Sequence, residues 1–76
     1  MSLSELKIGE KAFVTGVSAK GSIQSRLIAL GLTNGTEVKL SRQSAAKQTI
    51  IAQVGASVIA LRQEEAKTIH VRIHND

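Results

Sequence analysis

Two histidines are the side chains of this sequence that first invite a metal-binding hypothesis, because it contains no cysteine. His70 and His74 lie four residues apart in a segment that alternates apolar and polar residues, as a β-strand does. On a straight strand, residues at this spacing share a face but stand about 13 Å apart, whereas each ligand of one metal ion must approach it to about 2.1 Å. We therefore expect both histidines on a solvent-facing strand surface beside Arg72, and we assign no metal ligand and no cofactor.

The sequence offers no recognisable catalytic combination. Glu64 and Glu65 are adjacent, so on a helical turn they would point about 100° apart and would not form an acid–base pair. We expect them to be surface charges of that turn. Neither histidine lies near a serine in sequence, and no nucleophile-elbow or phosphate-loop pattern is present. A chain of 76 residues also has few buried positions left for a pocket, so we assign no catalytic residue and expect a protein that is not an enzyme.

The charged residues favour an anionic partner. Ten Lys and Arg residues against six Asp and Glu residues give a formal net charge of +4. A scattered solvated surface and a patch for an acidic protein face or lipid headgroups remain alternatives, since arginine can bind a carboxylate with two hydrogen bonds. Nucleic acid is disfavoured, because single-strand binding proteins stack bases on aromatic side chains and Phe13 is the only aromatic residue. The basic residues that lie close in sequence are Lys20, Arg26, Lys39, Arg42 and Lys47.

Part of this basic cluster falls on a predicted helix. Residues 22–30 carry apolar side chains at the i, i+4, i+7 spacing of an amphipathic helix, and Ser22 is suited to the N-cap position. Most of such a stripe packs in the core, although a short helix on a small domain does not bury every leucine. We expect at least two of Leu27, Leu30 and Leu32 to be buried, and Leu30 or Leu32 to remain as a contact for a partner.

Short β-strands are predicted on both sides of this helix. Residues 36–42 alternate between apolar and polar side chains and follow an Asn-Gly turn. Residues 49–54 and 57–62 are separated by Gly55-Ala56 and read as a hairpin. Further strands are expected within residues 11–18 and over 69–73, with a single helical turn at 63–67.

Five short strands and one brief helix in so few residues favour a small barrel, because closing the sheet removes its exposed edges. We expect an all-β, mainly β fold: an SH3-like or OB-like barrel of about five strands, with the helix inserted between the first and second strands. Residues 1–76 should form a single domain. The side chains expected to be largely buried are Phe13, Val14, Val38, Leu40, Ile51, Val58, Ile69, Val71 and Ile73.

At this point the run SRLIALGLTNGTEV, residues 25–38, resembles the signature of the FeoA family, small cytoplasmic proteins of ferrous-iron uptake. Residues 3–10 and 59–71 are similar to that family's beginning and end, so the resemblance covers nearly the whole chain. Ile8 and Asn34 each precede a glycine at positions where the family often carries proline. These departures affect the rigidity of two turns and leave the turns themselves possible.

The resemblance implies an SH3-like barrel and a non-enzymatic accessory that binds the cytoplasmic part of FeoB, the membrane ferrous-iron transporter with a cytoplasmic GTPase domain. The alternative is a free-standing SH3-like module with another protein or RNA partner, and a homo-oligomer is possible. Residues 1–5 lack the features of a secretory signal, and no apolar stretch is long enough to span a bilayer. We therefore expect a soluble, cytoplasmic protein. Because no convergent ligand set is apparent, we also expect that it does not itself hold ferrous iron with useful affinity.

The helix and the basic segment together give the expected transporter-facing surface. Arg26, Leu30, Lys39 and Arg42 are the residues that we expect to contribute to it. Leu30 would supply desolvated contact, while the cations would orient the complex and accelerate association.

Overall fold

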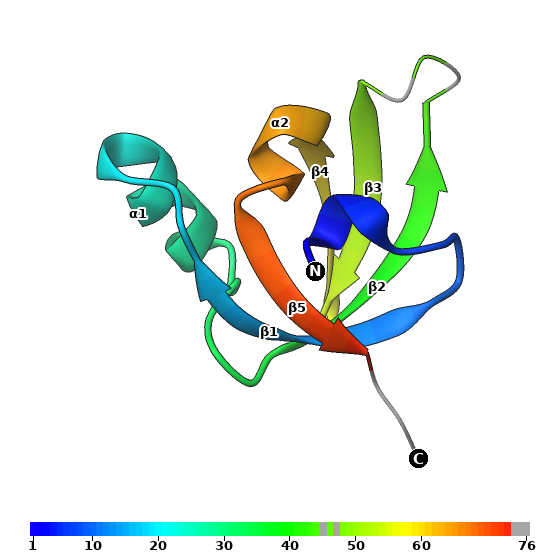
Figure 1. Ribbon diagram of the computed structural model, residues 1–76, viewed down its shortest axis with the longest axis horizontal. Coiled ribbons are helices and arrows are strands. Elements are labelled where there is room, and N and C mark those ends of the chain that lie inside the picture. Colours follow the sequence, from blue (N-terminus) through cyan, green and yellow to red (C-terminus); the bar gives the residue numbers. More distant parts are fainter. Residues whose placement is uncertain (45, 47, 74–76) are drawn as a thin grey trace.

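The computed structural model describes residues 1–44, 46 and 48–73. They form one antiparallel sheet with the strand order β4-β3-β2-β1-β5, and a helix lies between β1 and β2 (Figure 1). The expected mainly β fold of five strands with one inserted helix is therefore confirmed. In chain order the elements are η1 (Leu3–Glu5), β1 (Lys11–Val17), α1 (Gly21–Ala29), β2 (Glu37–Gln43), β3 (Thr49–Val54), β4 (Ser57–Arg62), α2 (Gln63–Ala66) and β5 (Ile69–Ile73).

The sheet curls around its own interior because two of its strand pairs are bulged. The register between β1 and β5 shifts between Val14 and Gly16, and that between β2 and β3 shifts between Leu40 and Arg42. A bulge bends its strand and increases the local twist. The two ends of the strand order, β4 and β5, are consecutive along the chain and are joined by the single turn of α2.

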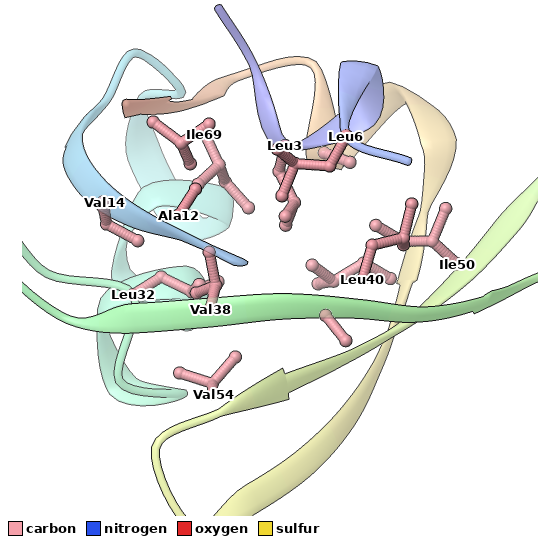
Figure 2. Packing of buried hydrophobic residues seen from close by; sticks show 14 of the residues in the cluster. Leu3, Leu6, Ala12, Val14, Leu32, Val38, Leu40, Ile50, Val54 and Ile69 are labelled. Atoms are coloured by element: carbon pink, nitrogen blue, oxygen red, sulfur yellow. The ribbon is translucent and has the colours of Figure 1, made fainter. Parts of the chain in front are cut away.

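The core is aliphatic and draws on every element. Leu3 belongs to η1 and Leu6 follows it directly. Figure 2 shows the side chains of both residues reaching into the buried cluster. No helix in the part of the chain that the structure describes is long and apolar enough to cross a membrane. The buried hydrophobic residues are Leu3, Leu6, Ala12, Val14, Leu27, Leu32, Val38, Leu40, Ile50, Ala52, Val54, Leu61, Ala66, Ile69 and Val71.

Four of the side chains expected in this core lie outside it, each for a reason of strand geometry. Phe13 is partly exposed because neighbouring strand residues point to opposite faces, and Ala12 and Val14 occupy the inner face of β1. Arg72 covers the Phe13 ring, with its guanidinium carbon 5.2 Å from the ring centroid. Ile51 is partly exposed by the same alternation along β3.

The other two residues wrongly expected in the core, Ile73 and Val58, lie at strand positions outside the barrel interior. Ile73 is partly buried at the end of β5. Val58 is 67% exposed because it lies on the outer face of β4, opposite the exposed Gln53 of β3. The remaining five expected core residues are buried as predicted: Val14, Val38, Leu40, Ile69 and Val71.

Helix α1 begins one residue before the predicted span, and its expected N-cap is wrong. Lys20 occupies the N-cap position without a side-chain capping hydrogen bond. Gly31, with φ of 98°, ends the helix in a conformation that favours glycine. Leu27 and Leu32 are buried and Leu30 is half-buried against the core, which confirms that at least two of these leucines are buried.

The N-terminal segment covers the β5 edge of the sheet. Ser2 forms an antiparallel bridge with His70, and the backbone N–H of Val71 donates to the carbonyl of Met1 at 2.9 Å. The backbone N–H of Ser2 donates to Oε1 of Glu5 at 2.8 Å, and this bond holds the pKa of Glu5 below its ordinary value. The β5 edge is therefore paired with the chain's own first residues.

The buried anchor of α1 can be tested by truncation. Leu27→Ala should lower the free energy of unfolding by about 2–5 kcal/mol, because it leaves a cavity where a fully buried leucine packs. Ile28→Ala is the matched control. Ile28 is the next residue of the helix and is 47% exposed, so its truncation should lower the free energy of unfolding much less. Urea denaturation of the two variants checks this, and equal losses would contradict the assignment of Leu27 as the anchor.

Candidate functional site

A groove of about 530 Å³ runs between α1 and the β4–α2 corner. The α1 wall is formed by Ser22, Ile23 and Arg26, and the facing wall by residues 60–62 with Thr49 and Glu65. Figure 1 shows α1 standing at the side of the sheet rather than across it. The groove therefore separates a projecting helix from the body of the barrel.

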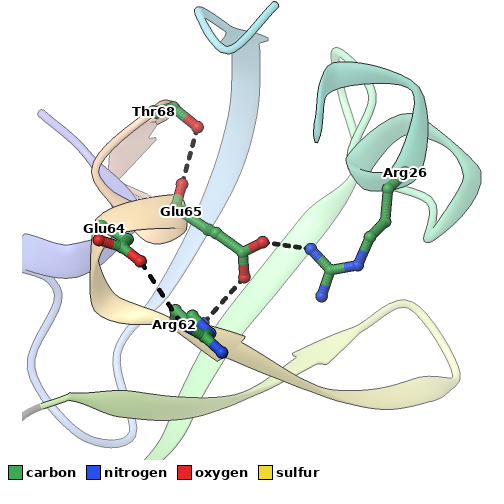
Figure 3. Close-up of polar contacts among 5 residues, drawn as sticks. All are labelled: Arg26, Arg62, Glu64, Glu65 and Thr68. Atoms are coloured by element: carbon green, nitrogen blue, oxygen red, sulfur yellow. Dashed lines mark hydrogen bonds and ion pairs between the residues drawn. The ribbon is translucent and has the colours of Figure 1, made fainter. Parts of the chain in front are cut away.

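Glu65 joins the two walls of this groove (Figure 3). Its Oε1 accepts a hydrogen bond from the backbone N–H of Arg62 at 3.0 Å, and its Oε2 forms an ion pair with the guanidinium of Arg26. Its carbonyl oxygen accepts hydrogen bonds from the backbone N–H of Thr68 at 3.0 Å and from Thr68 Oγ1 at 2.7 Å. One residue thus connects α1, the end of β4, α2 and the approach to β5.

The electrostatics of Glu65 follow from these contacts. The backbone hydrogen bond from Arg62, followed by the hydrogen bond and charge of Arg26, holds the pKa of the Glu65 carboxyl below its ordinary value against the opposing effect of burial. Glu65 is a charge of the helical turn, as expected, but it is not freely solvated, since its side chain is only 13% exposed. The expectation of a surface charge is confirmed for Glu64, which is 76% exposed and lies 3.9 Å from Arg62 Nη1.

Helix α1 presents two apolar side chains to solvent, one of them in the groove. Ile23 lines the groove and is 47% exposed, and Ile28 is exposed to the same extent. Leu27 is the buried residue of α1. Sequence reasoning predicted Leu30 or Leu32 as the exposed apolar contact, but Leu32 is buried and Leu30 packs partly against the core. The contact role of Leu30, which is partly exposed, stays a prediction, and α1 also leaves Ile23 and Ile28 open to solvent.

The structure places the four residues expected at the transporter-facing surface in two regions. Arg26 is in the groove and Leu30 follows α1 as its C-cap. Lys39 is half-buried on β2, aligned with Lys11 on β1, while Arg42 is exposed near the end of β2. In Figure 1 β2 rises on the right and α1 lies on the left.

These placements leave the partner-binding role of the four residues a prediction. Among the other basic residues, Lys20 is exposed at the N-cap of α1. Lys47 lies outside the described residues.

The two histidines are close to the C-terminal end of the given sequence. His70 is exposed on β5, and His74 lies outside the described residues. Within residues 1–44, 46 and 48–73, no group of three or more His, Cys, Asp or Glu side chains is arranged to hold a metal ion.

Comparison with known proteins decides the family. Residues 1–73 match the FeoA domain family. This chain is a member of the FeoA family. A candidate Fe(2+) transport protein A of Campylobacter jejuni is 34% identical to this FeoA-family chain over 73 residues, which cover 96% of this chain and 99% of the relative.

Solved FeoA structures share the fold. The FeoA protein from Chlorobium tepidum has a TM-score of 0.90 and 37% identity, with 96% of this FeoA-family chain and 70% of that chain covered. The zinc complex of Stenotrophomonas maltophilia FeoA has a TM-score of 0.85 and 36% identity, with 95% and 89% covered. That protein is described as a prokaryotic SH3 domain protein and a candidate activating factor of ferrous iron transport. The expected SH3-like architecture is thereby confirmed.

The role of the Glu65 carboxylate predicts a specific pH dependence. Because its pKa is lowered in the folded state, the stabilisation should be complete above the unfolded value of about 4.3 and should be lost as pH falls through the folded value. The difference in unfolding free energy between the parent and Glu65→Gln should therefore be largest at neutral pH and shrink on acidification. Urea denaturation from neutral pH to about pH 3 measures it. Glu64→Gln controls for removing one negative charge, and a difference for Glu65→Gln that stays constant with pH would contradict this role.

Metal binding gives a second test. Anaerobic calorimetry with Fe²⁺ should show no tight, stoichiometric binding, because the exposed His70 has no convergent ligand set among the described residues. Tight binding that is abolished by His70→Ala would refute this expectation.

Proposed function

We propose that this FeoA-family chain is a non-enzymatic accessory of ferrous-iron uptake that acts in the cytoplasm by binding the cytoplasmic part of a FeoB-type membrane transporter. Its similarity to the Campylobacter and Stenotrophomonas proteins, both described in terms of ferrous-iron transport, supports the process. Its family membership supports an accessory role.

The observation that carries a binding function is the open groove beside α1. Ile23 is half-exposed in that groove, whose lining also includes the cationic side chains of Arg26 and Arg62. An apolar contact framed by charged groups is typical of protein interfaces, where a few desolvated side chains supply most of the affinity and a polar rim surrounds them. Arginine at such a rim suits a partner that presents carboxylates.

The residues of the two regions would act differently in this complex. Ile23, Arg26 and Leu30 belong to α1 or its C-cap and would make direct contact with the transporter. Lys39 and Arg42, on β2, would contribute through the long-range attraction of a chain with net charge +4 for an acidic face, which raises the association rate.

The groove also bears on the alternative of a general SH3-like peptide module. Domains that bind proline-rich segments use grooves lined by aromatic side chains. The groove beside α1 is lined by aliphatic, hydroxyl and charged residues, and Phe13 lies on β1 beneath Arg72. The geometry therefore favours a folded or acidic protein partner over a proline-rich peptide.

The proposal is tested by measuring binding of the chain to the purified cytoplasmic region of the transporter. Ile23→Ser should weaken the complex by about tenfold or more, mainly through faster dissociation. Ile8→Ser is the matched control, because Ile8 is 65% exposed outside the groove and its replacement should leave affinity unchanged. Leu30→Ser should also accelerate dissociation once circular dichroism has shown that it is folded.

Charge reversal separates steering from contact. Lys39→Glu and Arg42→Glu should slow association and reduce its dependence on salt, with little change in the dissociation rate. Parent-like binding and iron uptake by all these folded variants would contradict the proposed surface. Salt-sensitive binding to unrelated RNA, with none to the transporter region, would favour the alternative of an RNA-binding module.

A further inference from the structure

The outer face of the sheet at β1, β2 and β5 carries most of the chain's net charge. Its side chains alternate along the strands with the buried residues of the core. Five basic and two acidic residues lie on this face or on the turn that leads into β1, a formal +3 out of the chain's +4. We call this surface the basic face. It comprises Lys7, Lys11, Lys39, Arg42 and Arg72, with Glu10 and Glu37.

Two lysines of the basic face lie directly opposite each other. Lys11 on β1 is aligned with Lys39 on β2. The N–H of Leu40 donates to the carbonyl of Glu10 at 3.2 Å, so the lysines form the adjoining non-hydrogen-bonded pair, in which side chains are closest. Like charges at such positions destabilise a sheet. An anionic group bound between the two ammonium groups would remove that repulsion.

The hollow at this lysine pair is small. Its volume is about 130 Å³, and its lining includes Lys11, Lys39, Glu37 and Gln53. Pockets for drug-sized ligands have volumes of about 300 Å³ or more, so this hollow suits a single small anionic group such as a phosphate. Glu37 would lie beside that group, and the two lysines together outweigh its charge.

The turn that leads into β1 presents an apolar side chain to solvent, since Ile8 is 65% exposed. Three hydrogen bonds fix this turn. The N–H of Glu10 donates to the carbonyl of Lys7 at 2.9 Å, and the N–H of Lys7 donates to Oε1 of Glu10 at 2.9 Å. The N–H of Gly9 donates to the carbonyl of Leu40 at 2.7 Å. Ile8 is therefore held in solvent beside β2, at one end of the basic face.

We propose that the basic face binds the surface of an anionic lipid bilayer. The cations contact headgroup phosphates, and Ile8 enters the boundary between headgroups and acyl chains. Clusters of lysine and arginine are attracted to the negative surface potential of anionic membranes. An apolar side chain within such a cluster adds buried area to that attraction.

Two features of the basic face favour a lipid surface over an acidic protein. Three of its five cations are lysines, which are depleted from protein interfaces but typical of segments that bind anionic membranes. Its exposed Ile8 projects from a turn, and a fluid bilayer accommodates a projecting side chain without a preformed pocket. Nucleic acid is disfavoured because the ring of Phe13, the chain's one aromatic residue, lies beneath Arg72 rather than open to stacking.

This inference goes beyond the proposed function and does not depend on it. The groove lies between α1 and the β4–α2 corner, whereas the turn of residues 7–10 is bonded to β2. In Figure 1 the blue segment between η1 and β1 lies on the right and α1 lies on the left. A chain bound to a bilayer through the basic face would leave the groove open to the transporter.

Flotation of the parent chain with phosphatidylcholine vesicles, prepared with and without phosphatidylglycerol, tests the proposal. Binding should require the anionic lipid and should weaken as salt is added. Lys11→Gln and Lys39→Gln should each lower the partition coefficient by about fivefold. Lys20→Gln is the matched control, because it removes the same charge at the N-cap of α1 and should have a much smaller effect.

The apolar contact is tested in the same assay. Ile8→Ser should lower the partition coefficient by about threefold or more, whereas Ile28→Ser, which alters a 47% exposed isoleucine of α1, should leave it close to that of the parent. In the transporter assay, which contains no lipid, Ile8→Ser should bind as the parent does. The membrane proposal and the groove proposal can therefore fail separately.

Four results would each overturn the membrane proposal. These are failure to bind anionic vesicles, equal binding to neutral and anionic vesicles, equal losses for Lys20→Gln and Lys39→Gln, and weaker binding of Ile8→Ser to the transporter region. The last result would assign the turn to a protein partner. Salt-sensitive binding to RNA, with none to vesicles, would assign the basic face to nucleic acid.

Discussion

The arrangement of this molecule depends on the contacts of one carboxylate, that of Glu65. Strands β4 and β5 are the two ends of the sheet, and α2 must turn the chain from one to the other within four residues. The Glu65 carboxylate caps that turn by accepting a hydrogen bond from the Arg62 N–H, and it forms an ion pair with Arg26 of α1. The backbone carbonyl of Glu65 accepts a hydrogen bond from the Thr68 hydroxyl. The same side chain therefore closes the corner of the barrel and fixes the helix that projects beside it.

The projecting helix follows from the small size of the chain. A domain of 76 residues has little interior, and its core is filled by aliphatic side chains from the sheet and from residues 3–6. Helix α1 places Leu27 in that core, while Ile23 and Ile28 remain half-exposed. The surface available for partners is thus the apolar area that a small barrel cannot enclose.

Local patterns predicted much of the fold, and long-range contacts account for what they missed. The alternation in residues 36–42 correctly placed Val38 and Leu40 inside, because a strand's period is a local property. The ion pair of Arg26 with Glu65 joins residues 39 apart in sequence, so no local pattern indicated it. Nor did the run of apolar residues in β4 show which of its faces is the inner one: Leu61 is buried, whereas Val58, opposite the exposed Gln53, lies on the outer face.

The central claim is that the groove between α1 and the β4–α2 corner is the surface that meets the transporter. The most direct measurement is a titration of the isotope-labelled chain with the cytoplasmic region of the transporter, followed by amide chemical shifts. The account predicts that the largest changes occur at Ile23 and Arg26 on α1 and at Ala60 across the groove. Changes confined to β2 around Arg42, with α1 unaffected, would contradict it.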